Sequence, residues 1–408
     1  MKAHDSYPVK DRDDATSVAM IDDSWMSGDE RRLFELALEM RPMLAAQEKV
    51  CQAEGNVSRE VVDEMKRRGL TRIVQPRQYG GLGSTTLLLG RVVEELSIAC
   101  ASSAWVLSVF GEHAWVQANF GAQAQEDVWG ADPLSVACSS LAPRAVAKVV
   151  DGGCTVSGTY PFASGCKHAQ WLIIGAWVEG DGRRDLRYML VPMSEVEVLD
   201  DWQTLGLRGT GSNTVALKDV FIPAHRTARD ADLQNGDTPG ASVHPDYPLL
   251  KAQRGALAIF TQLPVTLALA RRILHHTCVT MRGRVSRGMT TLSDSQVVQL
   301  RIGEAASDID AAILVAHRRH RLSIDKIKAG ERLTDAEVMA CKRDSIWANR
   351  TARRGIETLV GVSSAEIVHD RNPLQAWYRD SLTAGVHFGA NWEAGMVPFG
   401  RMQLAMPL

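Results

Sequence analysis

Long apolar runs are missing from this chain. No stretch approaches the roughly 18 uninterrupted apolar residues that a membrane-spanning helix requires. The segment from Met1 to Glu30 is polar and acidic, without the apolar core of a signal peptide. We therefore expect neither a membrane anchor nor export, and we place the protein in the cytoplasm.

Paired cysteines and an excess of positive charge are also missing. The seven cysteines are odd in number and scattered, with no Cys-x-x-Cys pair. This pattern favours reduced thiols over a disulfide framework or a zinc site. The formal net charge is −2, so there is no basic surplus to neutralise phosphates, and we expect no nucleic-acid partner.

What the chain does have is length and apolar content. Its 408 residues, of which 45% are hydrophobic, suffice for a large core and for two or three domains. Short apolar runs bounded by turn residues predict a β domain at 134–240, between stretches with helical patterns. We expect a flexible arm at 1–26, a helical domain at 27–133 and a helical bundle at 241–408.

Several helices have recognisable signals. Ser27, with Glu30 three residues later, forms a capping box ahead of an apolar pattern. Residues 58–68 and 87–108 predict two further helices. Long amphipathic stretches separated by short loops predict an antiparallel bundle. These stretches lie at about 248–281, 293–329, 333–361 and 374–386.

Five short motifs occur in an order that carries a family resemblance. They are Tyr79-Gly80-Gly81, Phe162-Ala163-Ser164-Gly165, the run from Trp202 to Ser212, Arg284 followed by Gly288, and Trp377-Tyr378-Arg379-Asp380. In this order the chain resembles the acyl-CoA dehydrogenase fold, and most of all its monooxygenase branch. The resemblance implies an α+β fold with an N-terminal helical domain, a central β-barrel-like domain and a C-terminal four-helix bundle.

The residues after Arg379 favour one branch of this fold. Acyl-CoA dehydrogenases usually carry a catalytic glutamate about eight or nine positions beyond this arginine, where this chain has His387 and Phe388. Glu393 is the nearest carboxylate. The resemblance therefore favours the monooxygenases. An acyl-CoA dehydrogenase with bound FAD and a base on another helix is the alternative, and a non-catalytic binding module is a third.

The resemblance also implies an activity. Oxygenase components of two-component flavin monooxygenases receive reduced flavin from a separate NAD(P)H-dependent reductase. Through a flavin C4a-hydroperoxide they insert one oxygen atom of O2 into a small aromatic substrate, phenol- or indole-like. Reduced FMN is favoured over FADH2, and N- or S-oxygenation is an alternative on the same fold. Relatives with this fold imply a homotetramer.

Three residues are candidates for catalysis. Ser164 ends a predicted strand where the resemblance places the flavin edge, and is the candidate hydrogen-bond partner of flavin N5. His387 is the candidate proton-handling group, because an imidazole with a pKa of about 6.5 is available at neutral pH. His113, in Gly-Glu-His-Ala-Trp, resembles the substrate-side histidine of aromatic hydroxylases. The plain alternatives are a turn serine, a helix-end histidine and a core histidine.

Other residues are candidates for binding. Arg208 and Ser212 lie in a glycine-rich loop whose N–H groups suit anions, and Arg284 matches a position that reaches a flavin phosphate across a subunit interface. His317 and His320 are one turn apart, but flanking arginines favour a solvated basic face, and we expect no metal site. The resemblance assigns further cofactor contacts to Ser140, Phe162, Ala163, Gly165 and Ser364, and the substrate pocket to Phe110, His113, Trp115, His387 and Asn391.

Overall fold

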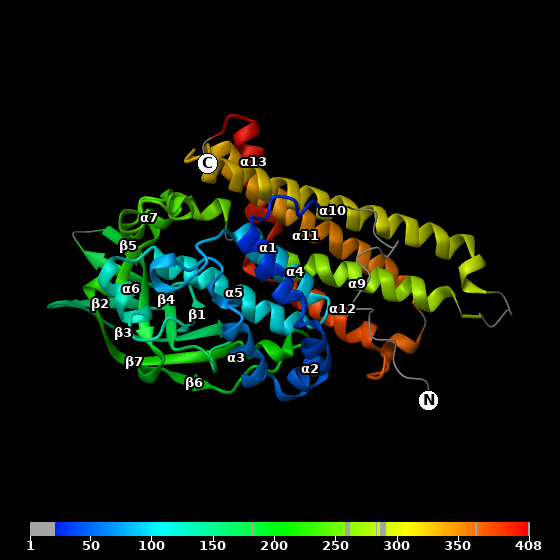
Figure 1. Ribbon diagram of the computed structural model, residues 1–408, viewed down its shortest axis with the longest axis horizontal. Coiled ribbons are helices and arrows are strands. Elements are labelled where there is room, and N and C mark those ends of the chain that lie inside the picture. Colours follow the sequence, from blue (N-terminus) through cyan, green and yellow to red (C-terminus); the bar gives the residue numbers. More distant parts are fainter. Residues whose placement is uncertain are drawn as a thin grey trace.

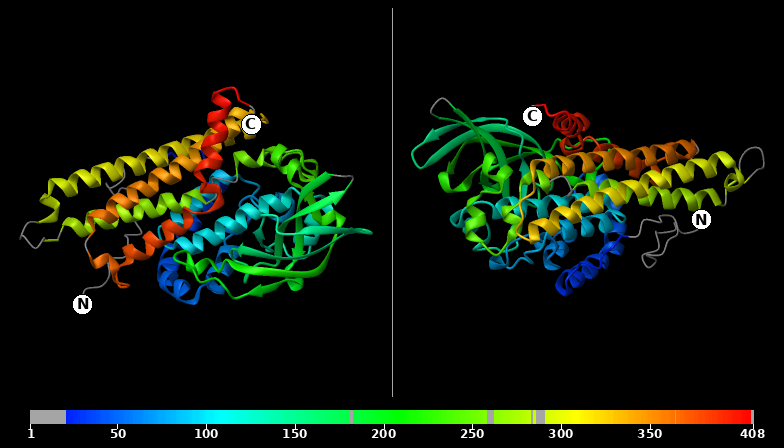
Figure 2. Two further views of the ribbon diagram at one scale, coloured as in Figure 1. Left: turned by 180° about the vertical axis from the view of Figure 1, so that it is seen from behind. Right: turned by 90° about the horizontal axis from the view of Figure 1, so that it is seen from above.

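A β-sheet unit and a bundle of long helices lie at opposite ends of the molecule, with the N-terminal helices beside both (Figures 1 and 2). No helix among the residues that the structure describes is long and apolar enough to cross a membrane. The computed structural model describes residues 21–180, 183–257, 262–282, 284–285, 291–363 and 365–406.

Six helices precede the sheet. The capping box of Ser27 and Glu30 is confirmed, because each side chain bonds the backbone N–H of the other residue. The expected single helix at 87–108 is wrong, since the chain is extended at Cys100 and divides it into two helices. Both helices are wholly buried, so no amphipathic pattern marks the break. The six are α1 (Gly28–Leu38), α2 (Arg41–Glu54), α3 (Arg59–Arg67), α4 (Thr86–Ser97), α5 (Ala101–Ala118) and α6 (Ala122–Trp129).

The β unit contains eight strands in the order β6-β7-β3-β2-β4-β5-β8, with β1 beside β4. All of them lie inside the range 134–240. The pairing of β3 with β7 shifts register between Tyr160 and Ala163, which bends the end of β3. The strands are β1 (Ala137–Ser140), β2 (Val146–Val150), β3 (Gly153–Ala163), β4 (Trp171–Gly180), β5 (Arg183–Pro192), β6 (Glu197–Leu199), β7 (Asn213–Pro223) and β8 (Thr227–Arg229).

Long helices form the other end of the molecule. The expected helix start at 248 is wrong: residues 248–251 and 254–256 form short 3-10 turns, and the α-helix begins at Leu263 with a proline in its first turn, where proline is well tolerated. An additional helix, α13, follows the bundle. The helices are α9 (Leu263–Arg282), α10 (Gln296–Lys328), α11 (Asp335–Val362), α12 (Pro373–Ala384) and α13 (Trp392–Gln403).

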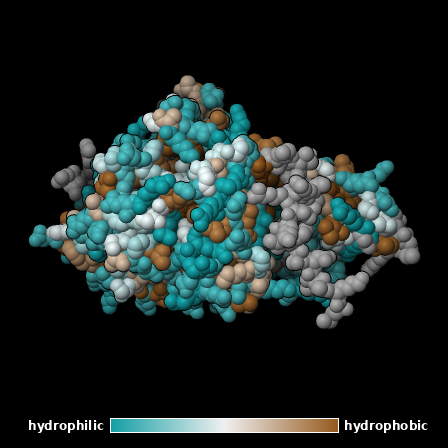
Figure 3. All heavy atoms as spheres, in the orientation of Figure 1, coloured by the Kyte–Doolittle hydropathy of each residue, from teal (hydrophilic) through white to brown (hydrophobic). Residues whose placement is uncertain are grey.

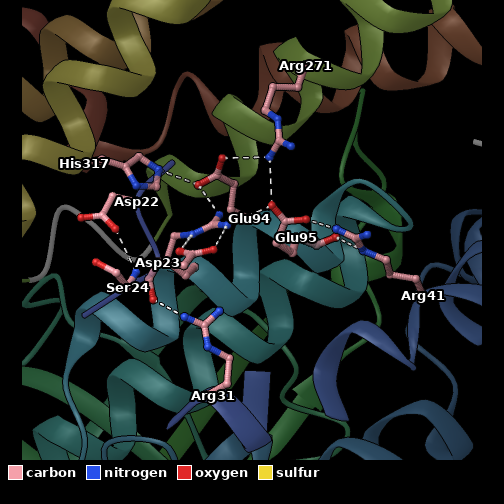
Figure 4. A network of polar contacts seen from close by, with 10 residues as sticks. Asp22, Asp23, Ser24, Arg31, Arg41, Glu94, Glu95, Arg271 and His317 are labelled. Carbon is pink, nitrogen blue, oxygen red and sulfur yellow. Dashed lines mark hydrogen bonds and ion pairs between the residues drawn. The ribbon is translucent and has the colours of Figure 1, made fainter. Parts of the chain in front are cut away.

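A buried charge network joins α4 to the bundle (Figure 4). Glu94 is fully buried and accepts hydrogen bonds from Arg91 at 3.1 Å, Arg271 at 3.1 Å and His317 at 2.7 Å. The expected solvated face for the histidines is therefore wrong. His320 is only 5% exposed and bonds Thr86, and burial lowers its pKa to about 3. The packing of α4 against α10 buries His320 and leaves His317 partly exposed, with its imidazole bonded to Glu94.

The N-terminal segment takes part in the same network. Residues 1–20 of the expected arm lie outside the described residues. From position 21 the chain packs on the core: Met26 is buried, and the Asp23 carboxylate accepts two hydrogen bonds from Arg91 at 2.9 and 3.1 Å. The face of the molecule seen in Figure 3 is mostly hydrophilic where residues are coloured, with apolar residues in small separate groups.

Candidate active site

Helix α5 supplies one wall of the candidate site. Trp105 on this helix is 7% exposed, and its indole Nε1 donates a hydrogen bond to Ser164 Oγ at 3.3 Å. The same ring meets the imidazole of His387 edge-on, with 5.5 Å between ring centroids. Trp105 therefore brings together two of the predicted catalytic residues. Sequence reasoning missed it, because a tryptophan in a wholly buried helix gives no signal beyond core packing.

Ser164 lies in the turn after β3 and contacts a second loop, which runs from Leu207 to Ser212. Its backbone N–H donates to the carbonyl oxygen of Phe162 at 3.0 Å, which leaves the side-chain hydroxyl as the group available to a ligand. That hydroxyl lies 2.7 Å from the hydroxyl of Ser212. Ser212 in turn lies 2.7 Å from Thr210, and the Thr210 hydroxyl donates to the Leu207 carbonyl at 2.8 Å.

Both loops hold unusual backbone conformations. Phe162 has a φ of 66° and Leu207 a φ of 50°. Positive values are costly for residues with large side chains and cluster at functional sites. Gly165 has a φ of 71°, and a Cβ atom there would lie 2.8 Å from the ring of Phe110. Its N–H donates to the Thr210 carbonyl at 2.9 Å, so the two loops are held in register.

His387 lies after α12, at the start of a 3-10 turn over Phe388–Ala390. Its Nδ1 accepts a hydrogen bond from the backbone N–H of Gly389 at 3.3 Å, which assigns the proton of the neutral ring to Nε2. Burial lowers the pKa of this imidazole to about 4, against a smaller opposing effect of the Glu112 carboxylate. The ring is therefore neutral at physiological pH and offers an Nε2–H donor.

His113 has both ring nitrogens occupied. Nδ1 donates to the Ala137 carbonyl at 2.8 Å, and Nε2 lies 2.8 Å from the hydroxyl of Ser139. Because Nδ1 holds the proton of the neutral ring, Nε2 accepts from Ser139. Burial lowers the pKa of His113. Ser139, which sequence reasoning missed, is half-buried and keeps its oxygen lone pairs.

Two of the predicted pocket residues have evident structural roles. Trp115 is 2% exposed, and its Nε1 donates to the Leu249 carbonyl at 3.0 Å. Asn391 is exposed, and its side chain accepts from the Ala394 N–H at 2.9 Å, capping α13. Neither of these hydrogen bonds involves Ser164 or His387.

The remaining predicted cofactor residues are spread over several elements. Ser140 donates its hydroxyl to the Pro161 carbonyl at 2.7 Å, just before Phe162. Arg208 is exposed in the turn that precedes Ser212, and Arg284 is half-buried after α9. Ala163 is fully buried beneath the turn. Ser364 lies outside the described residues.

Two exposed aromatic side chains stand close in sequence to the predicted catalytic residues, Phe162 before Ser164 and Phe388 after His387. Phe162 is 66% exposed and Phe388 is 74% exposed, whereas Ser164 and Ser212 are 8% and 4% exposed. Phe162 also meets Trp202 edge-on, with 6.0 Å between centroids. Apolar rings together with a few fixed polar groups suit a planar ligand. These residues fit the isoalloxazine ring of a flavin.

The second loop is anchored on the helical bundle. The backbone N–H of Leu207 donates to a carboxylate oxygen of Asp380 at 2.6 Å. A Cβ atom on the preceding Gly206 would lie 2.2 Å from the Arg379 carbonyl oxygen, so only glycine fits there. Burial, with a smaller contribution from the nearby Glu48 carboxylate, raises the pKa of Asp380 to about 7.

This raised pKa predicts a pH-dependent stability. A carboxyl whose pKa rises on folding binds its proton more tightly in the folded state, so its contribution favours folding at low pH and is lost as pH rises from about 4 to 7. Relative to Asp380→Asn, the native protein should lose about 2 kcal/mol of unfolding free energy between pH 5 and 7. Urea titrations of both proteins measure this difference, and equal pH dependence would contradict it.

Comparison with known proteins identifies the fold. The family model "Acyl-CoA dehydrogenase, N-terminal domain" matches residues 37–135, and "Acyl-CoA dehydrogenase, C-terminal domain" matches residues 261–392. The crystal structure of 3-HSA hydroxylase from Rhodococcus sp. RHA1 superposes with a TM-score of 0.87 and 31% identity, covering 92% of this chain and 97% of that one. The fold implied by the sequence motifs is confirmed.

Curated relatives identify the branch. The chain is 34% identical over 347 residues to the oxygenase subunit HsaA of a flavin-dependent monooxygenase from Rhodococcus jostii (strain RHA1), covering 84% of this chain and 91% of the relative. It is 32% identical over 349 residues to the oxygenase component of an FADH(2)-dependent resorcinol hydroxylase from Rhizobium sp. (strain MTP-10005), covering 83% and 85%. This chain belongs to the family of flavin-dependent monooxygenase oxygenase components, on the acyl-CoA dehydrogenase fold.

Proposed function

We propose that this flavin-dependent monooxygenase inserts one oxygen atom of O2 into a small aromatic substrate, phenol- or indole-like, at a centre formed by Ser164 and His387. The observation that carries the proposal is the position of Trp105, which bonds the hydroxyl of Ser164 and packs against the ring of His387. The names of the curated relatives, which include aromatic hydroxylases, support the substrate class.

Bound reduced flavin supplies the electrons that activate O2. The Ser164 hydroxyl would bond the flavin N5 edge, because its backbone N–H is already used and its oxygen accepts from Trp105 beside the ring of His387. Dry surroundings and a fixed hydrogen bond at N5 both suppress loss of reducing power to peroxide. Other cofactor contacts are assigned by resemblance to Ser140, Phe162, Ala163, Gly165, Arg208, Ser212, Arg284 and Ser364.

His387 acts as a hydrogen-bond donor in this proposal. Deprotonation of a phenol by His387 needs a free lone pair, whereas Nδ1 already accepts from Gly389. The neutral ring instead presents Nε2–H, which would donate a hydrogen bond to the reacting oxygen and orient it while keeping its own proton. The lowered pKa keeps this form at neutral pH.

The substrate side is assigned to His113 and Ser139. His113 is fixed by Ala137 and accepts the Ser139 proton, so the Ser139 oxygen is left to accept a hydrogen bond from a substrate hydroxyl. His113 then acts by setting the direction of the Ser139 hydroxyl. Phe110 lies one turn before His113 on α5, and its ring forms an apolar wall beside Gly165.

Replacing Ser164 by alanine should uncouple the reaction. Without the hydroxyl, reduced flavin still binds, but a several-fold larger share of its electrons should appear as hydrogen peroxide in place of hydroxylated product. The measurement is product and peroxide formed per reduced flavin consumed. Ser157→Ala is the matched control, since Ser157 lies on β3, the strand that leads to Ser164, but is exposed and bonds Asp219. Unchanged coupling in Ser164→Ala would remove this serine from the N5 role.

The partners follow the same family logic. The relatives are named as oxygenase subunits or components, which supports a separate flavin reductase as electron source for this chain.

We also propose a homotetramer. Its support is a row of exposed apolar residues on α10, which a second copy of the chain would cover. These residues are Val297, Leu300, Leu314 and Leu322.

A further inference from the structure

We propose that the hydroxyls of Thr210, Ser212 and Ser164 form a hydrogen-bond chain with one fixed direction, which makes the Ser164 oxygen an acceptor and lets the site select reduced over oxidised flavin. Thr210 and Ser212 are then positioning residues that act through Ser164. The proposal rests on the proposed contact between Ser164 and flavin N5.

The direction of the chain follows from counting hydrogens. A hydroxyl has one hydrogen to donate and two lone pairs. Thr210 donates its hydrogen to the Leu207 carbonyl, which can only accept. The 2.7 Å contact between Thr210 and Ser212 therefore requires Ser212 to donate. The hydrogen of Ser212 is then used, so its 2.7 Å contact with Ser164 requires Ser164 to donate.

The other neighbour of Ser164 completes the count. Trp105 Nε1 is a donor only, so it occupies one lone pair of the Ser164 oxygen. The hydrogen of Ser164 is directed to Ser212. One lone pair is left, and Ser164 can offer a ligand only an acceptor.

Burial keeps this direction in place. Thr210, Ser212 and Ser164 are 1%, 4% and 8% exposed, so the first two have almost no contact with solvent that could offer other partners. Reversal of the chain would remove the Thr210 hydroxyl from the Leu207 carbonyl, which also accepts from the Thr210 N–H at 3.1 Å and from Trp202 Nε1 at 3.2 Å. Reversal therefore costs one net hydrogen bond, about 0.5–1.5 kcal/mol. The Leu207 carbonyl at the end of the chain thus determines what Ser164 presents at the other end.

An acceptor at this position distinguishes the two oxidation states of a flavin. N5 of reduced flavin carries a hydrogen and can donate it to the Ser164 oxygen. N5 of oxidised flavin carries a lone pair, which would face the lone pair of Ser164. The match in one state and the repulsion in the other should make binding of reduced flavin about tenfold tighter or more, since one hydrogen bond corresponds to a factor of this order.

Thr210→Val tests the chain without altering Ser164. Valine keeps the shape of threonine but cannot accept from Ser212, which can then donate to Ser164 and free the Ser164 hydrogen to point at N5. Anaerobic titration with reduced and oxidised FMN and FAD gives the ratio of the two dissociation constants for each flavin. We expect Thr210→Val to lower this preference for reduced flavin about tenfold. Thr210→Ser, which restores the hydroxyl, should keep the native ratio.

A second variant protects the test against misfolding. Ser212→Ala also removes the acceptor of the Ser164 hydrogen, so it should lower the ratio in the same direction. A native ratio in folded Thr210→Val, or in Ser212→Ala where Thr210→Val fails to fold, would overturn the proposal.

Ser164→Ala separates this proposal from the function on which it rests. If Ser164→Ala lowers the ratio while Thr210→Val and Ser212→Ala do not, the contact with N5 stands and the directed chain is wrong. If Ser164→Ala leaves both affinities unchanged, the contact with N5 itself is wrong, and the proposal is overturned together with the role assigned to Ser164.

Discussion

Replacing His387 by alanine is expected to slow hydroxylation about 100-fold or more, while reduced flavin still binds. A positioned hydrogen-bond donor to a reacting oxygen contributes about 10²–10³-fold to a rate, and alanine removes the Nε2–H that this site offers. His387→Asn should recover part of the rate, because its amide can accept from the Gly389 N–H and donate from its nitrogen.

The measurement is a single turnover in which enzyme with reduced flavin and substrate is mixed with O2 and the product is quantified. His276→Ala is a suitable control, because His276 is a partly buried histidine of the bundle that packs on Trp377. A native rate of product formation in His387→Ala would show that this histidine takes no part in the chemistry.

The pH dependence of the native enzyme gives a separate check. The pKa of His387 is lowered to about 4 by burial, so the ring should stay neutral over the whole physiological range. Loss of activity through its protonation should therefore begin only below pH 5, well under the ordinary histidine value of about 6.5. An acid limb centred near 6.5 would contradict the lowered pKa of His387.

Replacing Glu94 by leucine is expected to lower the free energy of unfolding by about 3–5 kcal/mol. Glu94 is fully buried and lies between Arg91, Arg271 and His317 (Figure 4). Without its carboxylate these cationic groups lose a shared partner, and removing one member of a buried ion cluster is costly because the others stay desolvated. Arg91 retains Asp23 and Glu95, which limits the loss.

Urea denaturation of Glu94→Leu and of the native protein measures this loss. Glu304→Leu is the matched control, because Glu304 is a half-exposed glutamate on α10 that pairs with the exposed Arg301. Exposed pairs contribute about 0–1 kcal/mol, so the control should be nearly neutral. Equal stability of the two variants would mean that the cluster adds nothing beyond a surface pair.

Local signals in the sequence predicted much of the fold. The capping box at Ser27 and the helices of the bundle depend on neighbouring residues and on amphipathic periods, both of which a sequence displays. The break at Cys100 is not visible in such patterns, because buried residues lie on both sides of it. The start of α9 was misplaced because apolar residues at 248–256 also suit two 3-10 turns.

The site was predictable only in part. Ser164 and His387 could be placed because they stand in or beside motifs of the family, and Trp105 joins them in the structure. Ser139 lies in none of these motifs, and Thr210 lies inside the motif from Trp202 to Ser212 without a pattern that marks its hydroxyl. Thr210 matters because its hydroxyl belongs to a series of contacts that reaches Ser164, which is distant in the sequence. Ser139 matters because His113 bonds its hydroxyl through Nε2. No periodicity or composition encodes such contacts.

The hydrogen bond between the Leu207 N–H and Asp380 on α12 has a consequence for building chimeras. The loop that presents Thr210 and Ser212 bonds Asp380 of the bundle, and Gly206 leaves no space for a side chain against Arg379. A β domain transplanted from a relative would therefore meet a foreign surface at this seam. Recombinants that exchange 134–240 together with α12 should retain cofactor affinity better than those that exchange the β domain alone.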